Sequence, residues 1–209
     1  MTTTDRRVDA PGEDADEESV LVAARLHAHQ AFAAHTRPGR NAVWWAMVIG
    51  LVGIGTIASA FVYSYFYLRL GADTWPPDGT ALRPLGFPLV ALALLVVAAG
   101  VGPGGDRARW RLALSGGFGL IAGVVQVASL VDSDYDIAGN AYEALVVTMD
   151  SLAAIVLASA ILVRVFAVVH HRTAPRPGAL LDADTALWWG ATGIWVGLWL
   201  VVHVAPRIV

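Results

Sequence analysis

Asp150 is the acidic residue whose position most strongly suggests chemistry, because it lies inside the long apolar run Tyr142–Val169. Ionisable side chains are costly inside a membrane and are therefore candidates for function. Gln126 lies at a comparable depth in the preceding apolar run. If antiparallel helices carry these two residues, Gln126 can hydrogen-bond to Asp150. Two interpretations stay open, namely a structural polar bridge and a proton-linked site.

The six histidines raise the question of a haem or metal site, since imidazole is a common metal ligand. His170 and His171 end one predicted helix, whereas His203 ends another on the opposite side of the membrane, so one haem cannot join them. His27 and His29 are two residues apart, which on a helix turns them about 200° away from each other. The chain has no cysteine, which excludes thiolate metal sites. We expect no metal, no bound haem and no catalytic residue in this chain, and no nucleic-acid partner.

The composition and the apolar runs predict an all-α integral membrane protein. Of the 209 residues, 56% are hydrophobic and only 15% are charged, which is typical of a chain that folds in lipid. A helix needs roughly 20 apolar residues to cross about 30 Å of hydrocarbon. Five runs approach or exceed that length: Val43–Leu68, Leu85–Val101, Trp110–Val131, Tyr142–Val169 and Thr185–Val204. We predict five transmembrane helices in a domain covering residues 42–209.

The residues before the first apolar run are expected to lie in the cytoplasm. Residues 1–18 are acidic and contain no aromatic residue, which predicts a disordered tail, and residues 19–41 are expected to form a cytoplasmic surface segment. Arginines are retained on the cytoplasmic side of membrane proteins. Nine arginines flank the helices on the amino-terminal side and three lie on the other. This places the amino end inside and the carboxyl end in the periplasm or outside the cell, in a multi-pass protein of the cell inner (plasma) membrane.

Small residues at spacings of four predict where helices approach each other closely. Such rows are Ser115, Gly119 and Gly123; Gly55 and Ser59; and Gly193 and Gly197. Trp188, Trp195 and Trp199 fall on one stripe of the last helix, which favours packing over a cofactor site. Arg164 lies about 21 Å from Asp150 along their helix, so the two are not expected to pair. We expect Arg164 to extend toward the cytoplasmic interface.

One stretch of sequence resembles a known family. The first apolar run ends with Tyr65-Phe66-Tyr67-Leu68-Arg69 and is soon followed by Trp75-Pro76-Pro77. This is similar to subunit III of haem-copper oxidases (cytochrome c or quinol oxidases), in its short five-helix form. Weaker similarity extends to Gln126, to the start of the fourth helix, and to Trp188 and Trp195 in the last helix. The resemblance covers roughly residues 37–209.

The similarity does not extend to the ionisable residues that the family carries within its helices. Ile54 stands where a glutamate is usual, and Ala153 and Val156 stand where the family has two histidines. On the last helix, Trp189 and Thr192 replace a histidine and an aspartate. A proton-collecting role is therefore not expected to carry over.

The resemblance implies a noncatalytic subunit of a respiratory oxidase that reduces oxygen. Such a subunit would pack beside subunit I, near subunit II, stabilise the core and bind phospholipid, while haem and copper stay on the partner chains. Two alternatives remain, namely an accessory subunit of a nitric oxide reductase and a small membrane transporter that uses Asp150.

Overall fold

The computed structural model describes residues 20–27, 42–101, 108–133, 135, 137–170 and 177–208. These residues form helices and connecting turns, with no strand among them. Residues 20–27 are helical, within the predicted surface segment. The predicted tail at residues 1–18, and the rest of the segment up to residue 41, lie outside the described residues.

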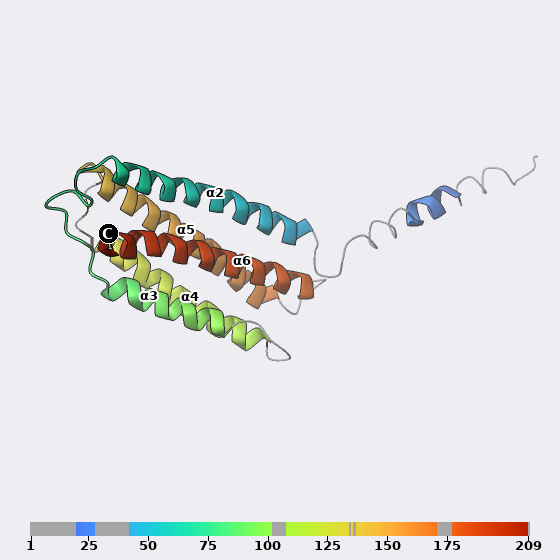
Figure 1. Ribbon diagram of the computed structural model, residues 1–209. Helices are drawn as coiled ribbons and strands as arrows, with labels where there is room; N and C mark the ends of the chain where they lie inside the picture. Colours follow the sequence, from blue (N-terminus) through green and yellow to red (C-terminus); the bar gives the residue numbers. More distant parts are fainter. Residues whose placement is uncertain are drawn as a thin grey trace, which may run out of the picture.

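Five long helices lie alongside one another (Figure 1). They are α2 (Ala42–Leu70), α3 (Gly86–Gly100), α4 (Ala108–Val131), α5 (Ala141–His170) and α6 (Pro177–Trp199). A π-helical turn, η2 (Leu200–Val204), continues α6 and leads into the short α7 (Ala205–Ile208). The all-helical prediction is confirmed.

Four helical segments of the described chain are long and apolar enough to cross a membrane, and the protein is a multi-pass membrane protein. They are Ala42–Leu70, Trp110–Val131, Ala141–His170 and Leu180–Ile208. Helix α3 is apolar but has only 15 residues, which at 1.5 Å per residue give about 22 Å. It is thus shorter than the hydrocarbon layer.

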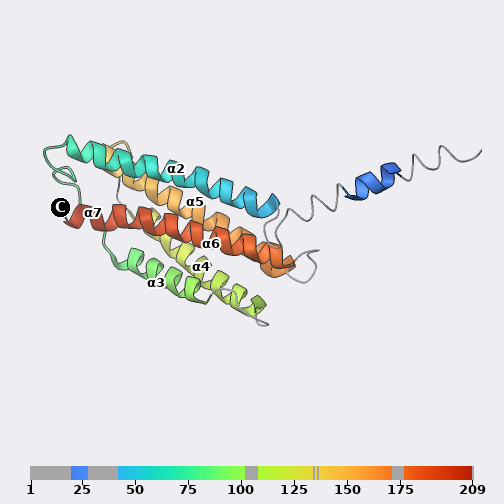
Figure 2. The ribbon, with the colours of Figure 1, turned by 45° about the vertical axis from the view of Figure 1, so that its right-hand side comes forward.

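Successive helices run in opposite directions, with α2 at one edge of the bundle and α3 at another (Figures 1 and 2). Helix α3 packs on α4, α4 on α5, α5 on α6, and α6 on α2. Only 6% of the most apolar stretch of α2 is buried, against 39% for α5. Helix α2 therefore leaves most of its apolar surface uncovered by the rest of this chain.

The ends of two helices show how local sequence sets the boundaries. Asn140 caps α5, because its Oδ1 accepts from the Glu143 backbone N–H at 2.9 Å and its Nδ2 donates to Glu143 Oε1 at 2.7 Å. The last helix was predicted to begin at Thr185, which is wrong: α6 begins at Pro177. Proline fits a first helical turn, since its missing N–H needs no partner there. The extra turns bring Asp182 and Asp184 into the helix.

Glycines on α4 and α6 allow the closest approaches between helices. A Cβ atom on Gly119 would lie 2.4 Å from Cη2 of Trp188, and one on Gly190 would lie 2.5 Å from Cδ1 of Leu51. The predicted packing role of the α4 row is confirmed, because Gly123 also faces Ile161. Gly193 and Gly197 differ, since a Cβ there would meet nothing within 4 Å. Trp188, Trp195 and Trp199 are buried, as the packing interpretation predicts.

Candidate functional site

Asp150 lies in a buried polar cluster formed by Arg83, Gln126, Asp150, His203 and Arg207, here called the Arg83 cluster. Gln126 Nε2 donates to Asp150 Oδ1 at 3.4 Å, which confirms the predicted contact between α4 and α5. Arg83, from the loop between α2 and α3, donates from Nη1 to Asp150 Oδ2 and forms an ion pair with it. The carboxylate is therefore held from two sides.

His203 and Arg207 complete this cluster from the last helix. His203 is 1% exposed and packs against the Trp199 ring at 5.4 Å. The exposed Arg207 donates to the backbone carbonyls of His203 and Arg83, and so ties the end of the chain to the loop. Pro206 follows the π-helical turn closely. Because proline has no backbone N–H, it cannot donate the hydrogen bond that would continue the α-helical pattern there. The cluster joins a loop and three helical segments.

Tyr135 covers Arg83 from the loop between α4 and α5. Its ring centroid lies 5.0 Å from the guanidinium carbon. The Tyr135 hydroxyl donates to the Ala81 carbonyl at 3.0 Å, and burial raises the pKa of its phenol above the ordinary value. Both loops are thereby fixed over the cluster.

A second buried cluster, the Arg164 cluster, consists of Ser115, Arg164, Asp184 and Trp188. Arg164 donates to both carboxylate oxygens of Asp184, with Nη2 to Oδ2 at 2.9 Å, and from Nη1 to Ser115 Oγ at 2.6 Å. Its guanidinium lies 3.9 Å from the Trp188 ring centroid. Ser115 Oγ in turn donates to the Ala98 carbonyl of α3 at 2.5 Å. A continuous polar chain thus joins α6, α5, α4 and α3.

The Arg164 cluster corrects one prediction. Arg164 does not extend to the interface; it is 1% exposed, because Asp184 supplies a buried counter-charge. Asp184 is a second buried acid, which the sequence did not single out beside Asp150. The prediction that Arg164 and Asp150 do not pair is correct.

Part of the family-like sequence, at the end of α2, in the following loop and at the start of α5, meets in an aromatic cluster of Tyr65, Trp75, Tyr135 and Tyr142. The Tyr65 and Trp75 rings are 5.5 Å apart, and Trp75 lies edge-on to Tyr142 at 5.4 Å. Tyr65 and Tyr142 are buried, whereas Trp75 is half-buried. Of the other motif residues, Arg69, Pro76 and Pro77 are half-buried and Phe66 and Leu68 are exposed. The motif therefore builds a packed junction between α2, its following loop and α5.

Among the described histidines, His170 and His203 do not converge. His170 is exposed and contacts the Phe166 carbonyl at 3.1 Å, while His203 lies in the Arg83 cluster. In the part of the chain that the structure describes, no three His, Cys, Asp or Glu side chains are grouped as metal ligands. The two buried clusters are separated by the length of α5 between Asp150 and Arg164, about 21 Å.

The sequence singled out Asp150 and Gln126. It did not indicate Arg83 and His203, which lie in the same cluster, or Asp184, which pairs with Arg164 in the second cluster. Comparison with models of known protein families gave no match, and no curated protein matches the chain.

Proposed function

We propose that this chain is a noncatalytic subunit of a respiratory haem-copper terminal oxidase, in the role that subunit III has in that family. The observation that carries the proposal is the junction of Tyr65, Trp75 and Tyr142. These residues resemble the family and come from separate segments of the chain, and their aromatic rings pack against one another. In this proposal these similar residues reflect a shared way of closing one end of the bundle.

The internal polar chemistry also supports a noncatalytic role. Asp150 is neutralised by Arg83, and Asp184 by Arg164, so these buried charges hold helices together. Removing one partner of such a pair leaves an uncompensated charge in the bundle. Haem and copper would belong to partner chains, in this proposal subunits I and II.

The exposed side of α2 offers a surface for such a partner or for lipid. Large apolar side chains remain uncovered along it, among them Trp45, Ile49 and Val52. Gly50 and Gly53 are on the same helix, and neither would meet another atom within 4 Å if it carried a Cβ. Small residues that the internal packing does not need are suited to a close helix contact with another membrane protein.

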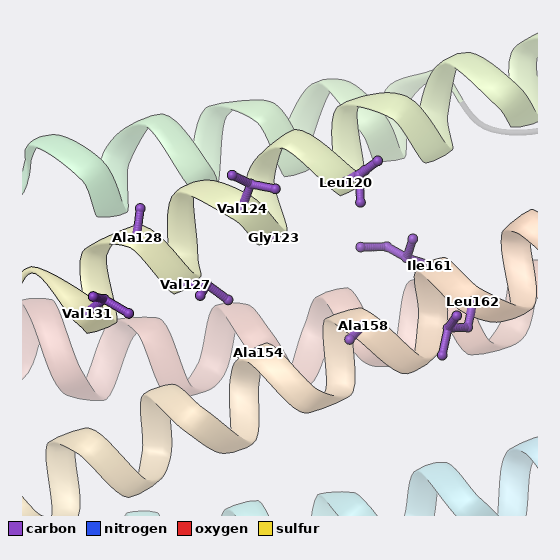
Figure 3. A pocket seen from close by; sticks show the side chains of 10 residues that line it. All are labelled: Leu120, Gly123, Val124, Val127, Ala128, Val131, Ala154, Ala158, Ile161 and Leu162. Carbon is purple, nitrogen blue, oxygen red and sulfur yellow. The ribbon is translucent and has the colours of Figure 1, made fainter.

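A further apolar groove lies between α4 and α5 (Figure 3). Its volume is about 650 Å³, and it is lined by Leu120, Gly123, Val124, Val127, Ala128, Val131, Ala154, Ala158, Ile161 and Leu162. In Figure 3, Val127 of α4 and Ile161 of α5 lie toward the space between the two helices. In a bilayer, phospholipid chains would fill such a groove, in keeping with the proposed lipid binding.

The proposal includes five membrane crossings in the cell inner membrane, with the amino end in the cytoplasm. Helix α3 packs along α4 and connects to it through a short loop, which supports counting α3 as a crossing despite its length. Arg164 and Arg83 are buried and therefore do not count as arginines at the membrane interface. Because they lie toward opposite sides of the membrane, the excess of arginines on the amino-terminal side remains.

Purification through a tag on this chain tests the proposal. In a mild detergent, the tagged chain should copurify with a larger membrane protein whose reduced-minus-oxidised spectrum shows haem bands, and the complex should consume oxygen. The chain expressed alone should be colourless. A complex that reduces nitric oxide and not oxygen would assign it to the alternative reductase. A tagged chain with no haem-containing partner would reject both.

A further inference from the structure

Arg83 carries two hydrogen-bond donors that nothing in the described chain satisfies. Its Nη1 is used by Asp150, but Nε and Nη2 have no partner, although the side chain is only 6% exposed. These two nitrogens lie on the same edge of the planar guanidinium group. That edge can bind an oxyanion through two parallel hydrogen bonds. Buried donors without acceptors are costly, so the free edge indicates a missing ligand.

The charge around this edge favours an anion. The Arg83 cluster holds two guanidinium groups, on Arg83 and Arg207, against the single carboxylate of Asp150. Both arginines lie close enough to His203 to act on it electrostatically. His203 Nδ1 is itself buried and unpartnered. Within the cluster an anion would therefore balance the charge and supply acceptors at the same time.

The rim of the cluster can rearrange to admit a ligand. The free edge of Arg83 is shielded in this structure, so binding requires neighbouring groups to shift. Arg207 is exposed, and within the described residues its side chain donates to two backbone carbonyls, those of Arg83 and His203. It can turn from these carbonyls toward an anion, since charged acceptors form stronger hydrogen bonds than neutral ones. The adjoining π-helical turn is a type of element often found at functional sites.

We propose that the Arg83 cluster binds a phosphate group, either as the headgroup of a phospholipid or as free phosphate. The free edge of Arg83 would hold two phosphate oxygens, and Arg207 would close over the rim. The site lies at the end of the bundle, where Arg83 precedes α3 and Arg207 lies in the last turn of the described chain. A phospholipid headgroup reaches this level of a membrane protein. The proposal does not depend on the proposed function.

The test measures the thermal unfolding of the full-length chain, purified and delipidated in an uncharged detergent. Inorganic phosphate is compared with sodium chloride at equal ionic strength, and phosphatidylglycerol with diacylglycerol of the same acyl chains. At saturating ligand, the phosphate-containing member should raise Tm by about 5 °C or more. A response to phosphatidylglycerol alone assigns the site to a lipid headgroup, and a response to inorganic phosphate assigns it to the free anion. Equal Tm values within both pairs would overturn the proposal.

Variants locate the effect at the cluster. Arg83→Lys keeps the charge but removes the guanidinium edge that can donate two parallel hydrogen bonds, so it should weaken phosphate binding roughly tenfold or more. Arg207→Gln leaves the ion pair with Asp150 intact and should also weaken binding, which keeps the test decisive if Arg83→Lys does not fold. Arg25→Gln, at an exposed position outside the bundle helices, is the control. If Arg25→Gln lowers the affinity as much as Arg207→Gln does, the ligand binds by general charge and the proposal is wrong.

Discussion

Gly119 of α4 lies directly against the indole ring of Trp188 of α6, so closely that a Cβ atom at residue 119 would lie 2.4 Å from Cη2. The Arg164 guanidinium lies over the same indole, 3.9 Å from the ring centroid. Trp188 thus contacts both a bare backbone and a buried charge. This arrangement fixes the distance between α4 and α6 and positions the Arg164 cluster.

Replacing Gly119 by alanine should destabilise the bundle, because the new methyl group must displace a buried ring. Overpacking of this kind typically costs about 1–3 kcal/mol. Gly117→Ala is a matched control on the same helix, since its Cβ would meet nothing within 4 Å. Unfolding of both variants in mixed micelles by increasing denaturing detergent measures the difference. If Gly119→Ala were as stable as Gly117→Ala, the close contact would not exist in the protein.

Asp184→Asn should be strongly destabilising, because it leaves Arg164 buried without its counter-charge. Breaking a buried ion pair from one side costs on the order of 3–5 kcal/mol. The control is Asp182→Asn, two residues earlier on α6 and exposed. Thermal unfolding of the purified chain should separate the two variants clearly. Equal stability would mean that the Arg164 guanidinium is neutralised by another group.

The Arg83–Asp150 pair can be isolated by a double-mutant cycle. Asp150→Asn and Arg83→Gln should each destabilise the chain, and the double variant should lose less than the sum of the two, with a coupling of about 1–3 kcal/mol. Unfolding free energies of the four proteins give that coupling. Additive losses would show that the two side chains do not interact.

Asn140→Ala should weaken the start of α5 by about 1 kcal/mol, the usual cost of losing an N-cap. Asn140→Ser keeps a side-chain oxygen that can accept from the Glu143 N–H, without placing a second carboxylate beside Glu143, and should retain most of the stability. Amide hydrogen exchange in the first turn of α5 is the suitable measurement. Exchange that is equally fast in the alanine and serine variants would contradict the capping role.

The helices could be predicted from the sequence because each apolar run is long and is separated from the next by residues that break helices. The start of α6 could not, since Asp182 and Asp184 make its first turns look like a loop. A polar residue marks a helix boundary only when it faces water. Asp184 instead faces Arg164, a residue 20 positions away, and sequence periodicity carries no information about such a partner.

The same limit applies to the Arg83 cluster. Asp150 and Gln126 were recognisable because they interrupt apolar runs on successive helices. Two helices joined by a short connection run antiparallel and pack against each other. Arg83 lies in a loop, where an arginine is ordinarily solvated, and its contact with Asp150 depends on the path of the whole loop over the bundle. His203 was assigned to a helix end, although the π-helical turn and α7 continue the helix beyond it.

We propose that this chain supports a redox core without holding its cofactors, and the haem content of the tagged complex tests that role most directly. The haem per tagged chain is measured in mild detergent and again after a harsher detergent has separated the subunits. We expect haem in the first preparation and none on the tagged chain in the second, with all haem recovered in the partner. Haem that stays with the isolated chain in a one-to-one ratio, or its absence from both preparations, would contradict the account.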